Sequence, residues 1–151
     1  DTPPPAAFAL PADGEWETAI APDWDALRAE ADRILAEFGL EVTVSERPEF
    51  YGAYHATAYC CEEYPHICGG NGVTASGTVP RQGLTCASDW AELPPGTWLY
   101  IEGVGIRRVE DSGSAILGKR LDIAVDTHDN ALRWAGFGSH DVWVLSWPAE
   151  A

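Results

Sequence analysis

The chain has 151 residues, a length that predicts one domain with its own hydrophobic core. Asp and Glu number 24 against 9 Lys and Arg, which gives a formal net charge of −15 at pH 7. A field of this sign repels phosphate backbones, so nucleic acid is excluded as an expected partner. The sequence contains no run of about 18 apolar residues, so no membrane-spanning helix is predicted.

The four cysteines are even in number and clustered, a pattern typical of oxidised, exported domains. A vicinal Cys60–Cys61 bridge would be strained, so two pairings remain open: Cys60–Cys68 with Cys61–Cys86, or Cys60–Cys86 with Cys61–Cys68. His66 also allows a zinc site, although the paired Cys-x2-Cys spacing of zinc modules is absent. Free thiols are the third alternative. We therefore expect disulfides, no metal or other cofactor, a monomer, and a secreted or cell-envelope location.

The first predicted element follows a proline-rich arm at residues 1–21, where the prolines exclude a helix. Apolar residues recur at spacings of three, four and seven over 23–38, which predicts an amphipathic helix. Asp23 is its candidate N-cap and Gly39 its candidate stop. Alternation over 41–45 predicts a short strand.

After residue 50 the sequence changes to short apolar and aromatic runs separated by turn residues. Such spacing predicts a small closed β-barrel with an N-terminal helical extension. We expect two parts, an N-terminal arm, helix and short strand at 1–48 and the barrel domain at 49–151. Strands are predicted at 51–59, 97–102, 105–110, 120–125 and 141–147, with helical turns at 128–135.

Two carboxylates, Asp111 and Asp122, bracket a glycine-containing turn. Like charges held near each other in a partly dry cleft cannot both ionise easily, so the pKa of one of them rises. A carboxylic acid that stays protonated near neutral pH can protonate a glycosidic oxygen. The alternative from spacing alone is that both are ordinary solvated loop residues.

A series of motifs surrounds these carboxylates: Ala-Thr-Ala-Tyr at 56–59, Thr-Ala-Ser-Gly at 74–77, Ala-Ser-Asp at 87–89, Leu-Pro-Pro-Gly-Thr at 93–97, Ile-Glu-Gly-Val-Gly at 101–105, Val-Glu-Asp-Ser-Gly-Ser-Ala-Ile-Leu-Gly-Lys-Arg-Leu-Asp at 109–122 and Asp-Thr-His-Asp-Asn-Ala-Leu at 126–132. In content and order, the chain from residue 52 to 146 resembles the three-Asp (3D) domain of bacterial cell-wall lytic enzymes. On this resemblance the namesake aspartates are Asp89, Asp111 and Asp122.

The resemblance implies a mainly β fold, a six-stranded double-psi β-barrel with short helices. That barrel also serves membrane-bound lytic transglycosylases of the A type, resuscitation-type muralytic enzymes and family-45 endoglucanases. The implied function is a peptidoglycan lytic transglycosylase with Asp122 as acid and then base, and with Asp111 as the neighbouring carboxylate that tunes it. Asp122 would protonate the oxygen between muramic acid and glucosamine, and the muramyl 6-hydroxyl would then attack to give a 1,6-anhydro sugar. One carboxylate suffices because the nucleophile is intramolecular.

Further positions are expected to contact substrate, since they match cleft positions of that family or offer rings and charges beside the cleft. Thr74 and Ser76 fit ordinary turn chemistry equally well, and Asp89 looks more structural, bonding backbone in a loop. The full set of expected substrate-contacting residues is Thr57, Tyr59, Glu62, Tyr64, Thr74, Ser76, Asp89, Gly113 and Lys119.

Two alternatives to the transglycosylase remain open. The segment from Thr57 through Cys60-Cys61 also resembles the opening of family-45 endoglucanases, in which an aspartate after the tyrosine is the general base. No aspartate stands there, so Glu62 or Glu63 would serve, and the enzyme would be an inverting hydrolase with Asp122 as acid. The second alternative is a non-catalytic, expansin-like wall-binding module. In every case the expected partner is a polysaccharide, either peptidoglycan strands or a β-1,4-glucan.

Overall fold

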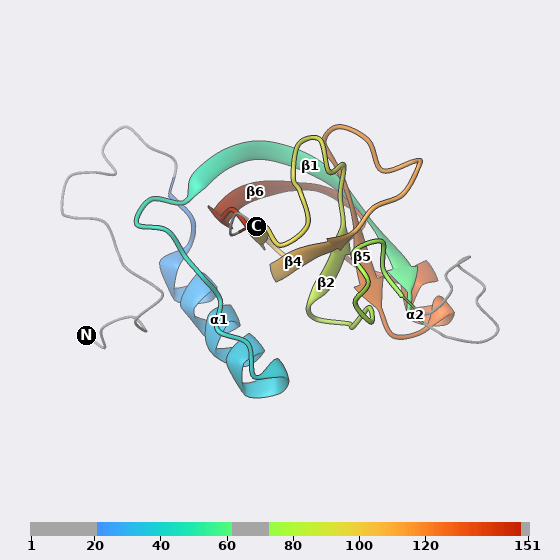
Figure 1. The fold of residues 1–151 in the computed structure, drawn as a ribbon, viewed down its shortest axis with the longest axis horizontal. Helices are drawn as coiled ribbons and strands as arrows, with labels where there is room; N and C mark the ends of the chain where they lie inside the picture. Colours follow the sequence, from blue (N-terminus) through green and yellow to red (C-terminus); the bar gives the residue numbers. More distant parts are fainter. Residues whose placement is uncertain (1–20, 62–72, 149–151) are drawn as a thin grey trace.

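The computed structural model describes residues 21–61 and 73–148, which form a β-barrel with a helix beside it (Figure 1). Across these residues the chain forms α1 (Trp24–Phe38), β1 (Glu49–Cys60), β2 (Thr85–Ala87), β3 (Trp98–Ile101), β4 (Gly105–Asp111), β5 (Arg120–Val125), α2 (His128–Leu132) and β6 (Gly138–Ser146).

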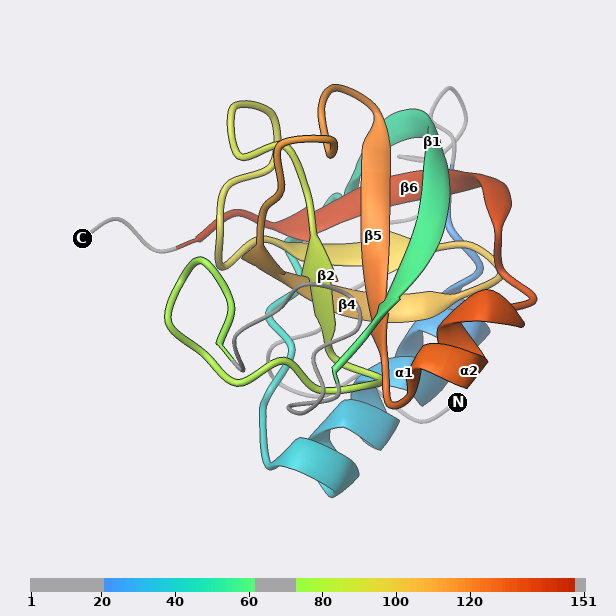
Figure 2. The ribbon, with the colours of Figure 1, turned by 90° about the vertical axis from the view of Figure 1, so that its right-hand side faces the viewer.

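The six strands close into a barrel in the order β1-β5-β2-β4-β3-β6. β1 pairs in parallel with β5, and β2 pairs in parallel with β4, whereas the other four pairings are antiparallel. Figure 2 faces β5, with β1 and β2 on either side of it. The predictions of a mainly β chain and of a closed six-stranded barrel are therefore confirmed.

The barrel interior is filled by side chains that alternate along the strands. Leu121 and Ile123 point inward, while Asp122 between them takes the opposite face of β5, as period-two alternation requires. The buried interior cluster consists of Tyr54, Ala56, Cys86, Leu93, Leu99, Ile101, Val109, Leu121, Ile123, Val142 and Val144.

The helix predicted at 23–38 is confirmed, with both of its ends. The Asp23 side chain accepts a hydrogen bond from the backbone N–H of Ala26 at 3.1 Å, which satisfies one of the free donors of the first turn. Gly39 ends the helix at φ 68°, a left-handed conformation that glycine adopts without a Cβ penalty.

The helix covers the outer side of the barrel that lies away from β5. Its buried residues Leu27, Ala31 and Ile34 share a cluster with side chains of β3, β4 and β6. In the closed strand order β3 stands opposite β5, so α1 and Asp122 lie on opposite sides of the barrel. Among the described residues, no helix is long and apolar enough to span a membrane.

One strand prediction is wrong, and one strand was not predicted. The segment 41–45 forms only an isolated bridge at Val44, beside which Ser45 N–H donates to the Leu145 carbonyl at 2.7 Å. β2 was missed since it has three residues, all buried, and therefore shows no alternation.

The disulfide prediction is wrong at Cys86. Each of the two expected pairings included a disulfide at Cys86, either to Cys61 or to Cys60. In the structure Cys86 is a free thiol that points into the barrel interior with no exposed surface. The alternation of side chains along β2 turns Cys86 into the interior cluster of the barrel. Cys68 lies outside the described residues.

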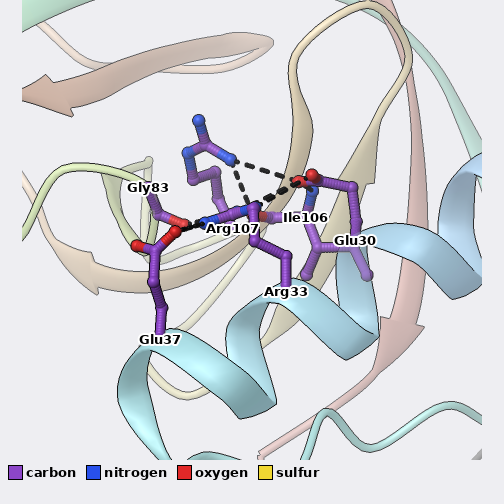
Figure 3. Close-up of polar contacts among 6 residues, drawn as sticks. All are labelled: Glu30, Arg33, Glu37, Gly83, Ile106 and Arg107. Atoms are coloured by element: carbon purple, nitrogen blue, oxygen red, sulfur yellow. Dashed lines mark hydrogen bonds and ion pairs between the residues drawn. The ribbon is translucent and has the colours of Figure 1, made fainter.

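Glu30 fastens α1 to the start of β4 (Figure 3). Its Oε1 accepts the backbone N–H of Ile106 at 3.0 Å, and its Oε2 accepts Arg33 Nε at 2.9 Å. Arg33 also donates to the Gly83 carbonyl at 2.8 Å, so Glu30 and Arg33 together hold the segment before β2 against α1. Gly105 leaves the room that the Glu30 carboxylate occupies, since a Cβ there would clash with it, and its φ of +127° is a conformation that other residues rarely adopt.

We therefore expect Gly105→Ala to lower the free energy of unfolding by roughly 2–4 kcal/mol, through backbone strain and through displacement of Glu30. Urea denaturation measures this loss. Gly77→Ala is the matched control, because Gly77 has φ +93° but open space where a Cβ would stand. Equal losses in the two variants would show that the contact with Glu30 contributes nothing.

Candidate active site

The two central aspartates lie in one row of register partners that crosses four strands. Thr57 on β1 pairs with Asp122 on β5, which pairs with Ala87 on β2, which pairs with Asp111 on β4. Directly paired residues point to the same face of a sheet. Since neighbouring strands are about 4.8 Å apart, the backbones of Asp122 and Asp111 are separated by about 10 Å across the outer face.

A β-bulge brings Asp111 to this face. Cys86 pairs with Val109, but the next residue of β2, Ala87, pairs with Asp111, so Glu110 is an extra residue in β4. Val109 points into the barrel, and strict alternation would send Asp111 inward as well. The bulge shifts the alternation by one residue and turns the Asp111 carboxylate outward.

The surroundings of Asp122 favour its protonated form. It is half-buried on β5, and Thr57 Oγ1 donates to its Oδ1 at 2.9 Å. Burial raises the pKa of Asp122 above its ordinary value, and the negative charge of Asp111 adds to the rise, while the Thr57 hydrogen bond and Arg120 oppose it. The net shift is upward, so the carboxyl group holds its proton to higher pH than an exposed aspartate does.

Asp111 is held in place by three donors. The backbone N–H groups of Ala75 and Ser112 each donate to Oδ1 at 2.9 Å, and the Tyr59 hydroxyl donates to Oδ2 at 3.3 Å. Trp90 Nε1 donates to the Asp111 carbonyl at 2.8 Å. Three separate segments hold the carboxylate and a fourth holds the backbone carbonyl, so the side chain of Asp111 has one fixed orientation.

Tyr59 links the two ends of the row. Its Cα pairs with that of Ala124, and its hydroxyl reaches Asp111 on β4, so the side chain crosses β5 and β2. The small side chains of Ala124 and Ala87 leave room for the ring on this path. Burial, followed by the charge of Asp111, raises the pKa of Tyr59 far above its usual range, so the phenol stays protonated and remains a donor.

Asp89, the third namesake aspartate, bonds loop backbone. Its side chain accepts the N–H of Ala91 at 3.0 Å and the N–H of Gly118 at 2.9 Å. The bond from Gly118, and then the bond from Ala91, lowers the pKa of Asp89. Asp89 therefore joins the loop after β2 to the loop before β5, which agrees with the structural interpretation of this residue.

The turn at 74–78 lies against the site, although its hydroxyl groups bond mainly to one another. Thr74 is buried; its Oγ1 lies 2.7 Å from Thr78 Oγ1 and 3.1 Å from Ser76 Oγ, and accepts the N–H of Thr78. This is turn chemistry. Ser76 is exposed beside it, and Ala75 contributes the N–H that binds Asp111.

Two predicted contact residues face other partners. Lys119 Nζ donates to the Tyr51 carbonyl and stands 4.8 Å from the centre of the Tyr54 ring, so its charge lies over the aromatic side of β1. Gly113 accepts the N–H of Ile116 in a turn, without a positive φ. Glu62 and Tyr64 lie outside the described residues.

A buried acidic residue that was not predicted from the sequence lies next to Asp111. Glu110 is only 2 % exposed, and its Oε1 accepts Thr85 Oγ1 at 2.8 Å and Thr78 Oγ1 at 2.9 Å. Its Oε2 accepts Arg108 Nε at 2.6 Å. Glu110 thus ties the 74–78 turn to β4, next to Asp111. The alternation of charged Arg108 and Glu110 around apolar Val109 was a possible signal that these two side chains share one face of β4. It did not reveal the bulge.

No group of three or more His, Cys, Asp or Glu side chains within 21–61 and 73–148 is arranged to hold a metal ion. The site in that part of the chain consists of carboxyl, hydroxyl and backbone N–H groups. This donor set suits proton transfer to and from a polar substrate.

A comparison with protein-family models matches residues 84–146 to the 3D domain. The match confirms the resemblance predicted from the motifs, and it contains Asp89, Asp111 and Asp122. It is shorter than the segment 52–146 expected from the motifs, since β1, with Thr57 and Tyr59, lies outside it. A comparison with curated proteins gives no match.

Among solved structures the chain is similar to the lytic transglycosylase MltA of E. coli. A ligand-free form of an MltA variant is 25% identical, with a TM-score of 0.42 over 51% of this chain and 28% of that one. A structure of MltA is 30% identical, with a TM-score of 0.39 over 50% and 27%. MltA with bound chitohexaose is 26% identical, with a TM-score of 0.42 over 55% and 30%. The chain thus spans less than a third of the length of these proteins.

Removing the hydroxyl donor of Thr57 tests the electrostatics of Asp122. We expect Thr57→Val to raise the pKa of Asp122 further, by about one pH unit, because a hydrogen bond to a charged group stabilises the ionised form by about 1.5 kcal/mol or more. NMR titration of the side-chain carboxyl carbon measures this shift. Asp89 is the internal control, since its carboxyl should titrate below its ordinary value in both proteins. An unchanged or lowered pKa of Asp122 would contradict the assigned contact.

Proposed function

From the 3D domain that residues 84–146 form, we propose that this chain is a glycan-cleaving enzyme, and specifically a lytic transglycosylase acting on peptidoglycan with Asp122 as its acid and base. The observation that carries the proposal is the raised pKa of Asp122 on an outward-facing strand position, with Thr57 bonded to the carboxyl group. A secreted or cell-envelope location and a monomeric state are part of the same proposal.

The proposed reaction needs one carboxyl group that acts twice. Protonated Asp122 gives its proton to the glycosidic oxygen as the bond from the anomeric carbon to that oxygen breaks, and positive charge develops at the anomeric carbon. The 6-hydroxyl of the same sugar then attacks that carbon, and the Asp122 carboxylate takes its proton. The enzyme ends in its starting protonation state, and the product is a 1,6-anhydro sugar. No water enters the reaction, because the nucleophile is already held beside the carbon.

Asp111 is proposed to act on Asp122 through its charge. Its three donors fix the carboxylate at the far end of the row, so that it raises the pKa of Asp122 without competing for the same proton. The same negative charge favours the positive charge that develops on the sugar. Thr57 keeps the Asp122 carboxyl in a single orientation through both proton transfers.

Mass spectrometry of soluble products from purified peptidoglycan tests this function. We expect 1,6-anhydro muropeptides from the wild type, and Asp122→Asn to release them at least about 100-fold more slowly because the proton donor is gone. Asp32→Asn is the matched control, since it makes the same change at an exposed position of α1, on the far side of the barrel.

Other products would point to the alternatives. Reducing-end products would indicate a hydrolase in place of a transglycosylase, and β-1,4-glucan would then be the next substrate to test. Binding to cell walls without any soluble product, in wild type and variant alike, would indicate a wall-binding module. Either outcome would contradict the proposed reaction.

A further inference from the structure

A hollow opens between α1, the end of β5 and the segment after α2. This arginine pocket has a volume of about 460 Å³, and its lining includes Arg33, Arg107, Arg133, Trp134 and Val125. Thr57, Asp111 and Asp122 are not part of its lining. It is therefore distinct from the row of residues proposed to carry out the reaction.

The charge of the arginine pocket is opposite to that of the chain. The whole sequence has 9 Lys and Arg against 24 Asp and Glu, whereas the pocket gathers three arginines against Glu30 and Glu37. An anion that the rest of the surface repels is thus attracted at this place. This local reversal favours a negatively charged ligand.

Arg107 is the residue in the pocket with unused hydrogen-bonding capacity. It lies on β4 two residues before inward-facing Val109, and its side chain is 12% exposed. One Nη group donates to the Ile106 carbonyl at 2.8 Å and stands 3.7 Å from Glu30 Oε1, as Figure 3 shows. Its Nε is buried and has no hydrogen-bond partner among the described residues. Burial lowers the pKa of Arg107, which reflects this incomplete compensation of its charge.

Arg33 and Arg133 have different roles. Arg33 is already bonded to Glu30, Glu37 and the Gly83 carbonyl, so it completes the wall of the pocket (Figure 3). Arg133 stands at the rim with its side chain 77% exposed, and it pairs with Asp129 at 3.3 Å. Since the Arg107 side chain is only 12% exposed, an anion that enters meets Arg133 before Arg107.

Apart from the amides of Gln82 and Asn130, the remaining side chains of the lining are apolar. Trp134 is half-buried against the barrel interior, and Val104 and Val125 stand near it. A planar guanidinium with free donors matches a carboxylate, and small apolar walls match methyl groups. The pocket chemistry thus fits a carboxylate attached to small aliphatic side chains, as in a short alanine-rich peptide.

We propose that the arginine pocket binds a carboxylate of the stem peptide attached to the glycan strand, with Arg107 as its ionic partner; this rests on the function proposed above. Val125 lies three residues beyond Asp122 on β5, which is about 10 Å along the strand. An extended peptide covers about 3.5 Å per residue, so three or four residues span this distance. The enzyme would then distinguish glycan that carries peptides from glycan that does not.

An NMR titration of the full chain tests the proposal without requiring turnover. Three probes separate the sources of a signal: a muropeptide with free carboxylates on its peptide, chitotriose, which has no carboxylate, and sodium acetate. We expect the Arg107 Nε–H and the Trp134 indole N–H signals to shift with the muropeptide and, at higher concentration, with acetate, but not with chitotriose. Asp122→Asn protein should give the same shifts, because the arginine pocket is separate from the proton donor.

Arg107→Met removes the charge while keeping the length of the side chain, and we expect it to weaken muropeptide binding at least tenfold. Arg47→Met is the matched control, with the same charge loss at an exposed position outside the pocket. Arg107→Met also removes a cationic partner of Glu30, so we expect a lower melting temperature, and the affinity is measured well below it. If Arg107→Met does not fold, Arg107→Lys provides the affinity measurement, with weakened binding again expected.

Three results would overturn the proposal: no shift of the Arg107 signal with any carboxylate, shifts with acetate but not with the muropeptide, or unchanged affinity in the Arg107 variant. Loss of cleavage products with intact muropeptide binding would instead contradict the proposed reaction and leave this site standing. Cleavage without muropeptide binding at the arginine pocket would contradict this site and leave the proposed reaction standing.

Discussion

The extra residue in β4 is the constraint on which the arrangement of the acidic groups depends. Without the bulge, Asp111 would follow Val109 into the barrel interior, where an ionised carboxylate is very unfavourable. With it, Glu110 and Asp111 both lie on the outer side of β4, one beneath a loop and one facing the row that contains Asp122. A single shift of register thus creates both the site and the support behind it.

That support is a buried polar network, and its members have different tasks. Glu110 bonds to hydroxyls of the 74–78 turn and of β2, so the turn cannot move away from β4 without leaving a buried carboxylate unsatisfied. The 74–78 turn also places the N–H of Ala75 where it donates to Asp111. The position of one acidic side chain is therefore fixed by its sequence neighbour, through a loop that lies far from both in the sequence. Such coupling makes the geometry of the site less dependent on side-chain fluctuation.

The parts of the structure with a strong local signal could be predicted from the sequence. The strand predicted at 120–125 is β5, and the Asp23 cap and the Gly39 stop correctly bounded α1. The motif resemblance identified Asp111 and Asp122 as the pair to examine. The features that were not predicted depend on tertiary context. β2 is too short to show alternation, and the register shift in β4 leaves no periodic pattern in the sequence. The cysteine count suggested bridges, but whether a thiol faces a loop or the interior depends on strand direction, which composition does not contain.

Because Cys86 lies in the barrel interior, the reactivity of its thiol reports how often the barrel opens. The thiol has no exposed surface, and burial raises its pKa to about 12, so in the closed barrel it neither meets solvent nor forms the reactive thiolate. An alkylating reagent can modify it only in molecules whose β2 has separated from its neighbours. The rate of modification therefore follows the population of open barrels, and a ligand that binds only the closed form slows it by the factor 1 + L/Kd, where L is the free ligand concentration. A residue that forms no bridge thus makes the conformational equilibrium of the whole domain measurable by mass spectrometry.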